Sequence, residues 1–203
     1  MKIVIVDYGL GNIRSITSTL KYLGIEDVVL SADFDMLKLA DKLILPGVGS
    51  FGNAMKLIRA KKIDHQLNEL VFKEKKPILG ICLGMQLLSQ SSNEDGDNAG
   101  LGFIDSDVLK FDTKSEKIPH VGFNQIEINE KSKLYKGMNL NPDFYFTHSF
   151  RMMGGTDINP SYCFYGEKFI ASFEKNNIAG VQFHPELSQG NGLKLLKNFI
   201  EIF

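Results

Sequence analysis

KPILGICLGMQLL, residues 76–88, is the stretch that decides the fold of this chain. Its first half is a continuous apolar run, which is typical of a β-strand buried on both faces of a parallel sheet. Gly80 and Gly84 flank Cys82, and a helix-like pattern follows directly. The stretch therefore predicts a buried strand, a tight turn at Cys82 and a helix that begins just after it.

The rest of the first half repeats this strand-and-helix pattern. The strand-like runs are IVIV (3–6), KLILP (42–46) and PILGIC (77–82), and the helical patterns are 12–23, 51–60 and 62–74. Strands that alternate with helices indicate a parallel sheet with helices on its faces.

The second half has a different character. It starts with a polar, glycine-rich loop at 91–102 and ends with a helix at about 190–202. Between them lie shorter strand signals of an antiparallel style, the last of which is AGVQF (179–183). We predict an α/β fold with a mixed, mainly parallel central sheet flanked by helices and an added antiparallel strand region. We expect one domain over residues 1–203, because no repeat or linker interrupts the chain.

Composition excludes several classes of function. The chain is 43% hydrophobic with a formal net charge of -1, so neither a nucleic-acid partner nor a membrane surface is expected. Cys82 and Cys163 are too few for a disulfide framework, which favours a cytoplasmic protein with reduced thiols. No close spacing of histidines and cysteines suggests a metal site, and we expect neither a metal nor a cofactor.

Cys82 is a candidate nucleophile. The pattern G-x-C-x-G between a strand and a helix is a cysteine version of the turn that exposes a nucleophile at the carboxyl end of an α/β sheet. The N-terminus of the following helix favours a thiolate. Gln86, four residues later, faces the same way on a helix and can bind a polar substrate. The alternative is a small buried cysteine at a glycine-rich strand end.

His184 and Glu186 are the candidate partners of this cysteine. A cysteine nucleophile needs a general base, and the base needs an orienting group. Two residues apart in extended backbone, these side chains point to the same side. An isolated H-P-E is more often a surface turn. We interpret His184 and Glu186 as partners of Cys82 because this motif occurs together with the cysteine motif.

The turn Pro46-Gly47-Val48-Gly49 follows the predicted strand at 42–46. Glycines at the carboxyl end of a strand can aim backbone N–H groups at a developing oxyanion. The N–H of Leu83, directly after the candidate nucleophile, would complete such a hole. The alternative is an ordinary glycine-proline turn.

Segments along nearly the whole chain carry a resemblance to one family. They are DYGLGN (7–12), PGVGSFGNAM (46–55), LGICLGMQLL (79–88), GLGFI (100–104), IPHVGFN (118–124), FYFTHSF (144–150) and VQFHPELSQ (181–189). In this order they resemble the class I, or triad, glutamine amidotransferases, and within them the glutaminase subunits of imidazole glycerol phosphate synthase. The resemblance implies a flavodoxin-like glutaminase fold.

The resemblance also implies a mechanism. Cys82 would attack the side-chain amide of glutamine, His184 would carry the proton and Glu186 would orient the imidazole. The implied oxyanion hole consists of Val48, Gly49 and Leu83. The implied glutamine-binding positions are Gly47, Gln86, Ser149 and Phe150.

In that family the partner is a separate (β/α)8-barrel synthase subunit, which forms a heterodimer with the glutaminase and receives its ammonia. The glutaminase is slow until the partner binds its ligand. The positions implied to face the partner are Asn12, Phe123 and Leu187. This chain has Phe123 where the family usually has Trp, Leu187 where it has Lys and Phe150 where it has Tyr.

Other interpretations stay open. The departures at Phe123 and Leu187 are compatible with a paralogous glutaminase that supplies a sugar amidotransferase of surface-polysaccharide or nucleotide-sugar synthesis. A catalytically silent regulatory relative and a standalone hydrolase with the same cysteine motif are further alternatives. The intact Cys82, His184 and Glu186 argue against a silent relative.

Overall fold

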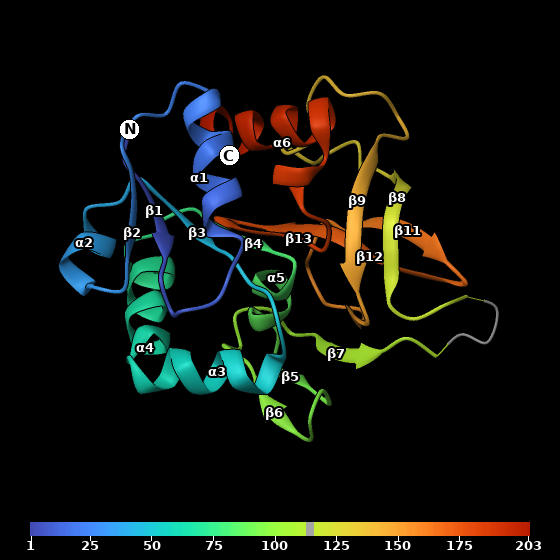
Figure 1. The fold of residues 1–203 in the computed structure, drawn as a ribbon, viewed down its shortest axis with the longest axis horizontal. Coiled ribbons are helices and arrows are strands. Elements are labelled where there is room, and N and C mark those ends of the chain that lie inside the picture. The colour runs from blue at the N-terminus through green and yellow to red at the C-terminus, as the bar shows by residue number, and fades with distance from the viewer. Residues whose placement is uncertain (113–115) are drawn as a thin grey trace.

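A nine-stranded sheet forms the centre of the molecule (Figure 1). The structure is a computed structural model and describes residues 1–112 and 116–203. The strands that run parallel are, in spatial order, β2 (Val28–Ser31), β1 (Ile3–Val6), β3 (Lys42–Leu45), β4 (Ile78–Ile81) and β13 (Ile178–Val181). The antiparallel strands that continue the sheet are β12 (Glu167–Lys175), β11 (Ser161–Tyr165), β8 (His120–Glu127) and β9 (Asp143–His148).

The predicted mixed α/β sheet with antiparallel strands is confirmed. The antiparallel region continues the central sheet, and β13 joins the two parts. The sequence pattern of β13 predicted an antiparallel strand. β13 does pair antiparallel with β12, but it pairs parallel with β4. Its burial on both faces explains the continuous apolar run, which does not distinguish the two kinds of pairing. No separate sequence signal predicted β2, none of whose four residues is fully buried.

Helices cover both faces of the sheet. One face carries α1 (Ile13–Tyr22) and α6 (Gln189–Glu201), and the other carries α2 (Phe34–Lys38), α3 (Phe51–Ala60), α4 (Ile63–Asn68), a π-helical turn (Glu69–Lys73) and α5 (Leu83–Leu87). Each face of the sheet has its own hydrophobic core. Ile3 and Ile5 of β1 belong to the core under α1 and α6, and Val4 and Val6 belong to the core on the opposite face. Successive side chains of a strand point to opposite faces, so one strand supplies both cores.

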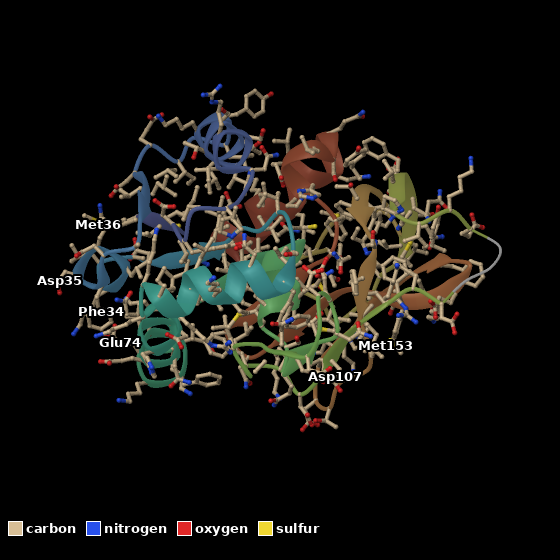
Figure 2. All side chains as sticks on the ribbon, turned by 60° about the horizontal axis from the view of Figure 1, so that its bottom comes forward. Phe34, Asp35, Met36, Glu74, Asp107 and Met153 are labelled. Atoms are coloured by element: carbon tan, nitrogen blue, oxygen red, sulfur yellow. The ribbon has the colours of Figure 1, made fainter. Side chains whose placement is uncertain are left out.

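A small four-stranded sheet lies beside the central one. Its strands are β10 (Phe150–Met152), β7 (Asp107–Lys110), β5 (Ser91–Ser92) and β6 (Asn98–Ala99). β5 and β6 lie within the segment predicted to be a loop, because two-residue strands leave no periodic pattern. In Figure 2, Asp107 and Met153 lie together where this sheet ends. The Met153 N–H donates to the Asp107 carbonyl at 2.8 Å.

The predicted helices are found close to their expected bounds. α1, α3 and α6 lie within the ranges 12–23, 51–60 and about 190–202 to within a residue. The range 62–74 divides into α4 and the π-helical turn. Among the described residues, none of the helices has the length and apolarity needed to cross a membrane.

Candidate active site

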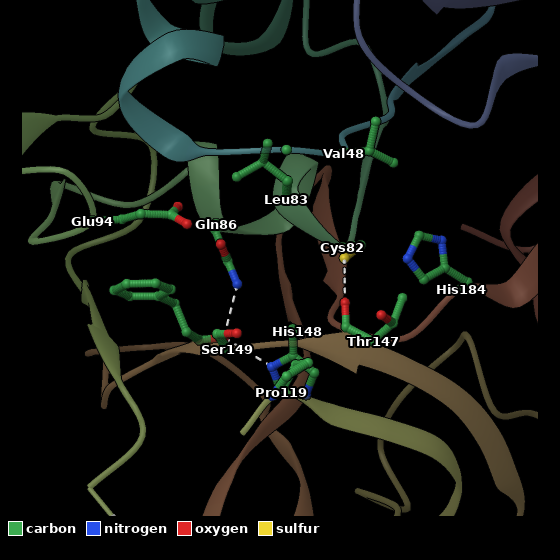
Figure 3. Close-up of a pocket in the computed structure, with 12 residues that line it drawn as sticks. Val48, Cys82, Leu83, Gln86, Glu94, Pro119, Thr147, His148, Ser149 and His184 are labelled. Atoms are coloured by element: carbon green, nitrogen blue, oxygen red, sulfur yellow. Dashed lines mark hydrogen bonds between the residues drawn. The ribbon is translucent and has the colours of Figure 1, made fainter. Parts of the chain in front are cut away.

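Cys82 occupies a strained turn between β4 and α5. Its backbone has φ 54° and ψ -113°, a region that costs a non-glycine residue about 1–3 kcal/mol. Its N–H donates to the Val181 carbonyl at 2.8 Å, and its thiol donates to the Thr147 carbonyl at 3.8 Å. The predicted turn is therefore confirmed, and the strain is concentrated on the one residue whose sulfur faces the cavity (Figure 3).

The flanking glycines allow two backbone segments to approach each other. A Cβ on Gly84 would lie 1.9 Å from the Leu45 carbonyl oxygen, and a Cβ on Gly80 would lie 2.7 Å from the Gly84 carbonyl oxygen. The sequence interpretation assigned them to the turn itself. The positive φ instead belongs to Cys82, while the glycines let α5 pack directly on β3 and β4.

His184 lies just beyond β13, the strand next to β4, so sheet pairing places it near Cys82. Its Nδ1 is 2.8 Å from Glu186 Oε1, and both side chains are almost completely buried. Residues Pro185–Leu187 form a 3-10 turn, so the pair meets across a turn and the expected extended backbone is wrong. The side chains nevertheless come together as the sequence predicts.

The charge state of His184 follows from its neighbours. Burial by itself lowers its pKa, but the interactions with Cys82 and Glu186 outweigh this effect and raise the pKa to about 10. His184 is thus an imidazolium at neutral pH when Cys82 is a thiolate. Such a pair provides both the nucleophile and the proton that a leaving amine requires.

Asn12 takes part in this arrangement. Its Nδ2 donates to Glu186 Oε1 at 3.1 Å, so one carboxylate oxygen accepts from both Asn12 and His184. Glu186 Oε2 is buried and has no hydrogen-bond partner among the described residues. Asn12 was predicted to face a partner, and the structure places its amide on the carboxylate of the candidate triad.

A cavity of about 290 Å³ opens over Cys82. Its lining residues are Val48, Gly49, Cys82, Leu83, Gln86, Glu94, Pro119, Thr147, His148, Ser149, Phe150 and His184. Most of the predicted site residues thus meet in one place (Figure 3). Gly47 is not part of the lining; a Cβ there would lie 2.5 Å from the Gly84 nitrogen, so Gly47 packs against the start of α5.

Gln86 faces the cavity as expected, but its amide nitrogen is engaged. It donates to the Phe150 carbonyl and to Gln182 Oε1, both at 2.9 Å. Gln182 in turn lies 3.8 Å from the Cys82 sulfur through its Nε2 and is fully buried. Gln86 therefore positions the cavity wall, and only its carbonyl oxygen remains for a ligand.

The turn after β3 offers hydrogen-bond donors beside Cys82. Among the described residues, the N–H groups of Val48 and Gly49 have no protein partner. Gly49 has φ 91°, a conformation that favours glycine. Leu83 is the first residue of α5, so its N–H is also free of the helix.

Glu94 was missed by the sequence interpretation, because it lies in the polar segment 91–102 that was predicted to be a loop. His120 and His148 belong to the segments IPHVGFN and FYFTHSF, but the contact between them was not predicted. Glu94 Oε2 accepts the Phe51 N–H at 2.7 Å, and burial raises its pKa although this bond acts in the opposite direction. His148 Nδ1 lies 2.8 Å from the Phe150 carbonyl, and its Nε2 lies 3.1 Å from His120 Nδ1. A carbonyl can only accept, so His148 donates from Nδ1 and accepts from His120.

Burial lowers the pKa of His148 to about 3 and that of His120 to about 4, so both are neutral donors in this chain of bonds.

Phe123 and Leu187, predicted to face a partner, are exposed by 47% and 41%. In the described residues no group of three or more acidic, histidine or cysteine side chains has the geometry of a metal site.

Comparison with known proteins identifies the family. The model of the family "Glutamine amidotransferase class-I" matches residues 4–202. The chain belongs to the class I glutamine amidotransferases. It is 45% identical over 201 residues to imidazole glycerol phosphate synthase subunit HisH 1 of Campylobacter jejuni, covering 98% of this chain and 100% of that protein. It is 41% identical over 200 residues to subunit HisH of Aquifex aeolicus, covering 98% and 96%.

Solved structures agree on the fold of this class I glutamine amidotransferase. A crystal structure described as a glutamine amidotransferase superposes with a TM-score of 0.77 at 20% identity, covering 98% of this chain and 97% of the other. PurLQS from Thermotoga maritima contains a chain with a TM-score of 0.74 at 20% identity, covering 98% and 97%. At such identity the likeness supports the fold alone.

Proposed function

We propose that this chain is the glutaminase subunit of an imidazole glycerol phosphate synthase of histidine biosynthesis, with residues 1–203 acting as one glutaminase domain. The observation that carries the chemistry is the arrangement of Cys82, His184 and Glu186 at one cavity. The relatives named as subunits of this synthase, 41–45% identical over nearly their whole length, support the choice of pathway.

The reaction starts at Cys82. Its thiolate attacks the side-chain carbonyl carbon of glutamine, and the N–H groups of Val48, Gly49 and Leu83 stabilise the resulting oxyanion. The His184 imidazolium gives its proton to the departing nitrogen, so ammonia leaves and a glutamyl thioester remains. His184, now neutral, takes a proton from water, which attacks the thioester. Glutamate leaves, and the thiolate and imidazolium are restored.

The cavity wall supports recognition of the amino-acid end of glutamine. Glu94 provides a carboxylate for the α-ammonium group on the side of the cavity beyond Gln86 (Figure 3). The backbone at Ser149 and Phe150 is held by His148 and Gln86 and offers polar groups to the substrate. We expect this end to set the affinity for glutamine and the Cys82 end to set the rate.

We propose a separate (β/α)8-barrel synthase subunit as partner, in a heterodimer that passes ammonia to the barrel. Phe123 and Leu187 are exposed apolar side chains suited to such a contact, and Leu187 follows the carboxylate of Glu186 directly. Ligand binding to the barrel would raise the glutaminase rate by reorienting the Val48–Gly49 peptide. The reduced thiols that this chemistry needs favour a cytoplasmic location.

One observation favours a second candidate acceptor. Leu187 places an apolar group where the resemblance leads us to expect an ammonium group, and these are not equivalent at a polar contact. In addition, Methanococcus maripaludis has two relatives, named HisH 1 and HisH 2, which are 44% and 42% identical to this chain. A paralogous glutaminase that feeds a sugar amidotransferase is therefore the alternative.

Reconstitution tests the proposal. The chain is combined with the barrel subunit of the same organism and a ribulosyl-formimino nucleotide, with either glutamine or ammonium chloride as the nitrogen source. We expect imidazole glycerol phosphate from both sources, and from ammonium chloride alone when Cys82 is replaced by Ala. Product from ammonium chloride but none from glutamine with the intact chain would show that this glutaminase serves another acceptor.

A further inference from the structure

The segment DYGLGN (7–12) touches the turn after β3 as well as the triad. Tyr8 lies two residues beyond β1, is fully buried and donates its hydroxyl hydrogen to the Pro46 carbonyl at 2.7 Å. Pro46 directly precedes Gly47, Val48 and Gly49, so this bond holds the peptide at which the turn begins.

Pro46 is also held from the side of its ring. A Cβ on Gly11 would lie 2.9 Å from Pro46 Cβ and from its Cγ, so the backbone at Gly11 packs on the ring. Gly11 has φ 145°, which favours glycine at this close approach. Gly47 is fixed against α5 by its contact with Gly84.

The far end of the turn has no such support. Val48 is 38% exposed, and a Cβ on Gly49 would have no heavy atom within 4 Å. The turn is thus anchored at Pro46 and Gly47 and loosely packed at Val48 and Gly49. Where the two free N–H groups lie relative to Cys82 depends on the anchored end.

We propose that Tyr8 is a positioning residue, whose hydroxyl fixes the Pro46 carbonyl so that the N–H groups of Val48 and Gly49 face the oxyanion that forms on attack by Cys82. This inference rests on the proposed glutaminase function. Burial and the nearby charge of Cys82 raise the pKa of Tyr8, so the hydroxyl keeps its proton and remains a donor at every pH at which the enzyme works.

The test compares two tyrosine-to-phenylalanine variants of the full chain. Tyr8→Phe removes the hydroxyl at the turn. Tyr135→Phe is the matched control, because Tyr135 is also buried and bonds Ser172 Oγ at 2.6 Å, away from the cavity. Three quantities are measured for each: kcat and KM for glutamine with the barrel subunit present, the rate of Cys82 alkylation by iodoacetamide, and Tm.

We expect Tyr8→Phe to lower kcat by about 10- to 100-fold, with KM and the alkylation rate within about twofold, because alkylation forms no oxyanion. Tyr135→Phe should lower Tm comparably and leave kcat unchanged. If Tyr8→Phe does not fold at the assay temperature, the same quantities are measured for all three proteins at a lower temperature at which it is folded.

Unchanged kcat in Tyr8→Phe overturns the role of Tyr8, as does a parallel fall of kcat and alkylation rate, which would mean general loosening of the site. A wild-type chain without glutaminase activity overturns the proposed function instead. The two failures are therefore distinguishable in one experiment.

Discussion

Glu186→Gln removes a charge from the triad while keeping the shape of the side chain. In a Ser-His-Asp triad, an amide in place of the carboxylate forces the histidine into the wrong tautomer, with a loss of about 10⁴ in kcat. Here a single oxygen, Oε1, accepts from both His184 Nδ1 and Asn12 Nδ2, at 2.8 and 3.1 Å. The amide oxygen of the variant can occupy that position, so we expect the tautomer to be kept and only the charge to be lost.

The expected loss follows from the effect of that charge on His184. An adjacent opposite charge shifts a pKa by about 1–3 units, and each unit is worth about 1.4 kcal/mol, or about tenfold in rate. We therefore expect kcat for glutamine hydrolysis to fall by about 10- to 1000-fold. KM should change little, since Glu186 does not line the cavity.

The same change alters the pH dependence. The pKa of His184 is raised from 6.5 to about 10, so the stability that the imidazolium contributes is complete below pH 6.5 and is lost as the pH rises through about 10. Glu186→Gln should accordingly lower Tm more at pH 6 than at about pH 10. Alkylation of Cys82 by iodoacetamide at neutral pH should also slow. Without the charge of Glu186, a smaller fraction of His184 is protonated, and the imidazolium stabilises the thiolate less.

We measure kcat and KM in a stopped-flow or coupled glutaminase assay, the rate of Cys82 alkylation with iodoacetamide, and Tm by thermal unfolding. Glu174→Gln is the matched control: Glu174 is a buried carboxylate that accepts the Leu134 N–H at 2.9 Å, far from the cavity lining. It should lower Tm without affecting kcat. If kcat of Glu186→Gln equals that of the wild type, or falls by the full 10⁴ typical of a flipped tautomer, the reasoning from the shared oxygen is wrong.

The remaining predictions concern the nucleophile, its glycine and the partner face. Cys82→Ala should abolish glutaminase activity. Cys163→Ala should retain it, because burial raises the pKa of the Cys163 thiol to about 12 and so keeps it unreactive. Equal losses of activity in a glutamate-release assay would contradict this. Gly84→Ala places a methyl carbon 1.9 Å from the Leu45 carbonyl oxygen, so stability should fall by roughly 3 kcal/mol and Tm by about 6–12 °C; an unchanged melting curve would refute the close approach. Leu187→Asp should weaken binding of the barrel subunit without changing Tm, and unaltered affinity by calorimetry would exclude Leu187 from the interface.

The sequence predicted those parts of the fold that have a local signature. The apolar runs identify β1, β3 and β4, and helical spacing identifies α1, α3 and α6. The pairing of β13 with β4 was not predictable, because a short buried strand has the same pattern in parallel and antiparallel neighbours. That pairing brings His184 to Cys82, so the triad was inferred from co-occurring motifs and the resemblance rather than from topology.

Contacts made by side chains over long sequence distances account for what was missed. Asn12 bonds Glu186 across 174 residues, and Gln182 lies 3.8 Å from the Cys82 sulfur, with no sequence signal beyond being a polar residue in an apolar run. Tyr8 and Glu94 likewise meet the site only after folding. Polar residues of this kind become informative when burial shows that their hydrogen bonds must be satisfied inside the protein.

In the proposed reaction glutamine is cleaved through a thioester on Cys82, and acid quenching during turnover traps that thioester for detection. The chain is mixed with radiolabelled glutamine, quenched within the first turnovers, digested and separated. We expect label on the peptide that contains Cys82, released by neutral hydroxylamine and absent from Cys82→Ala. Glutamate formation without label on that peptide, or label that persists in Cys82→Ala, would contradict it.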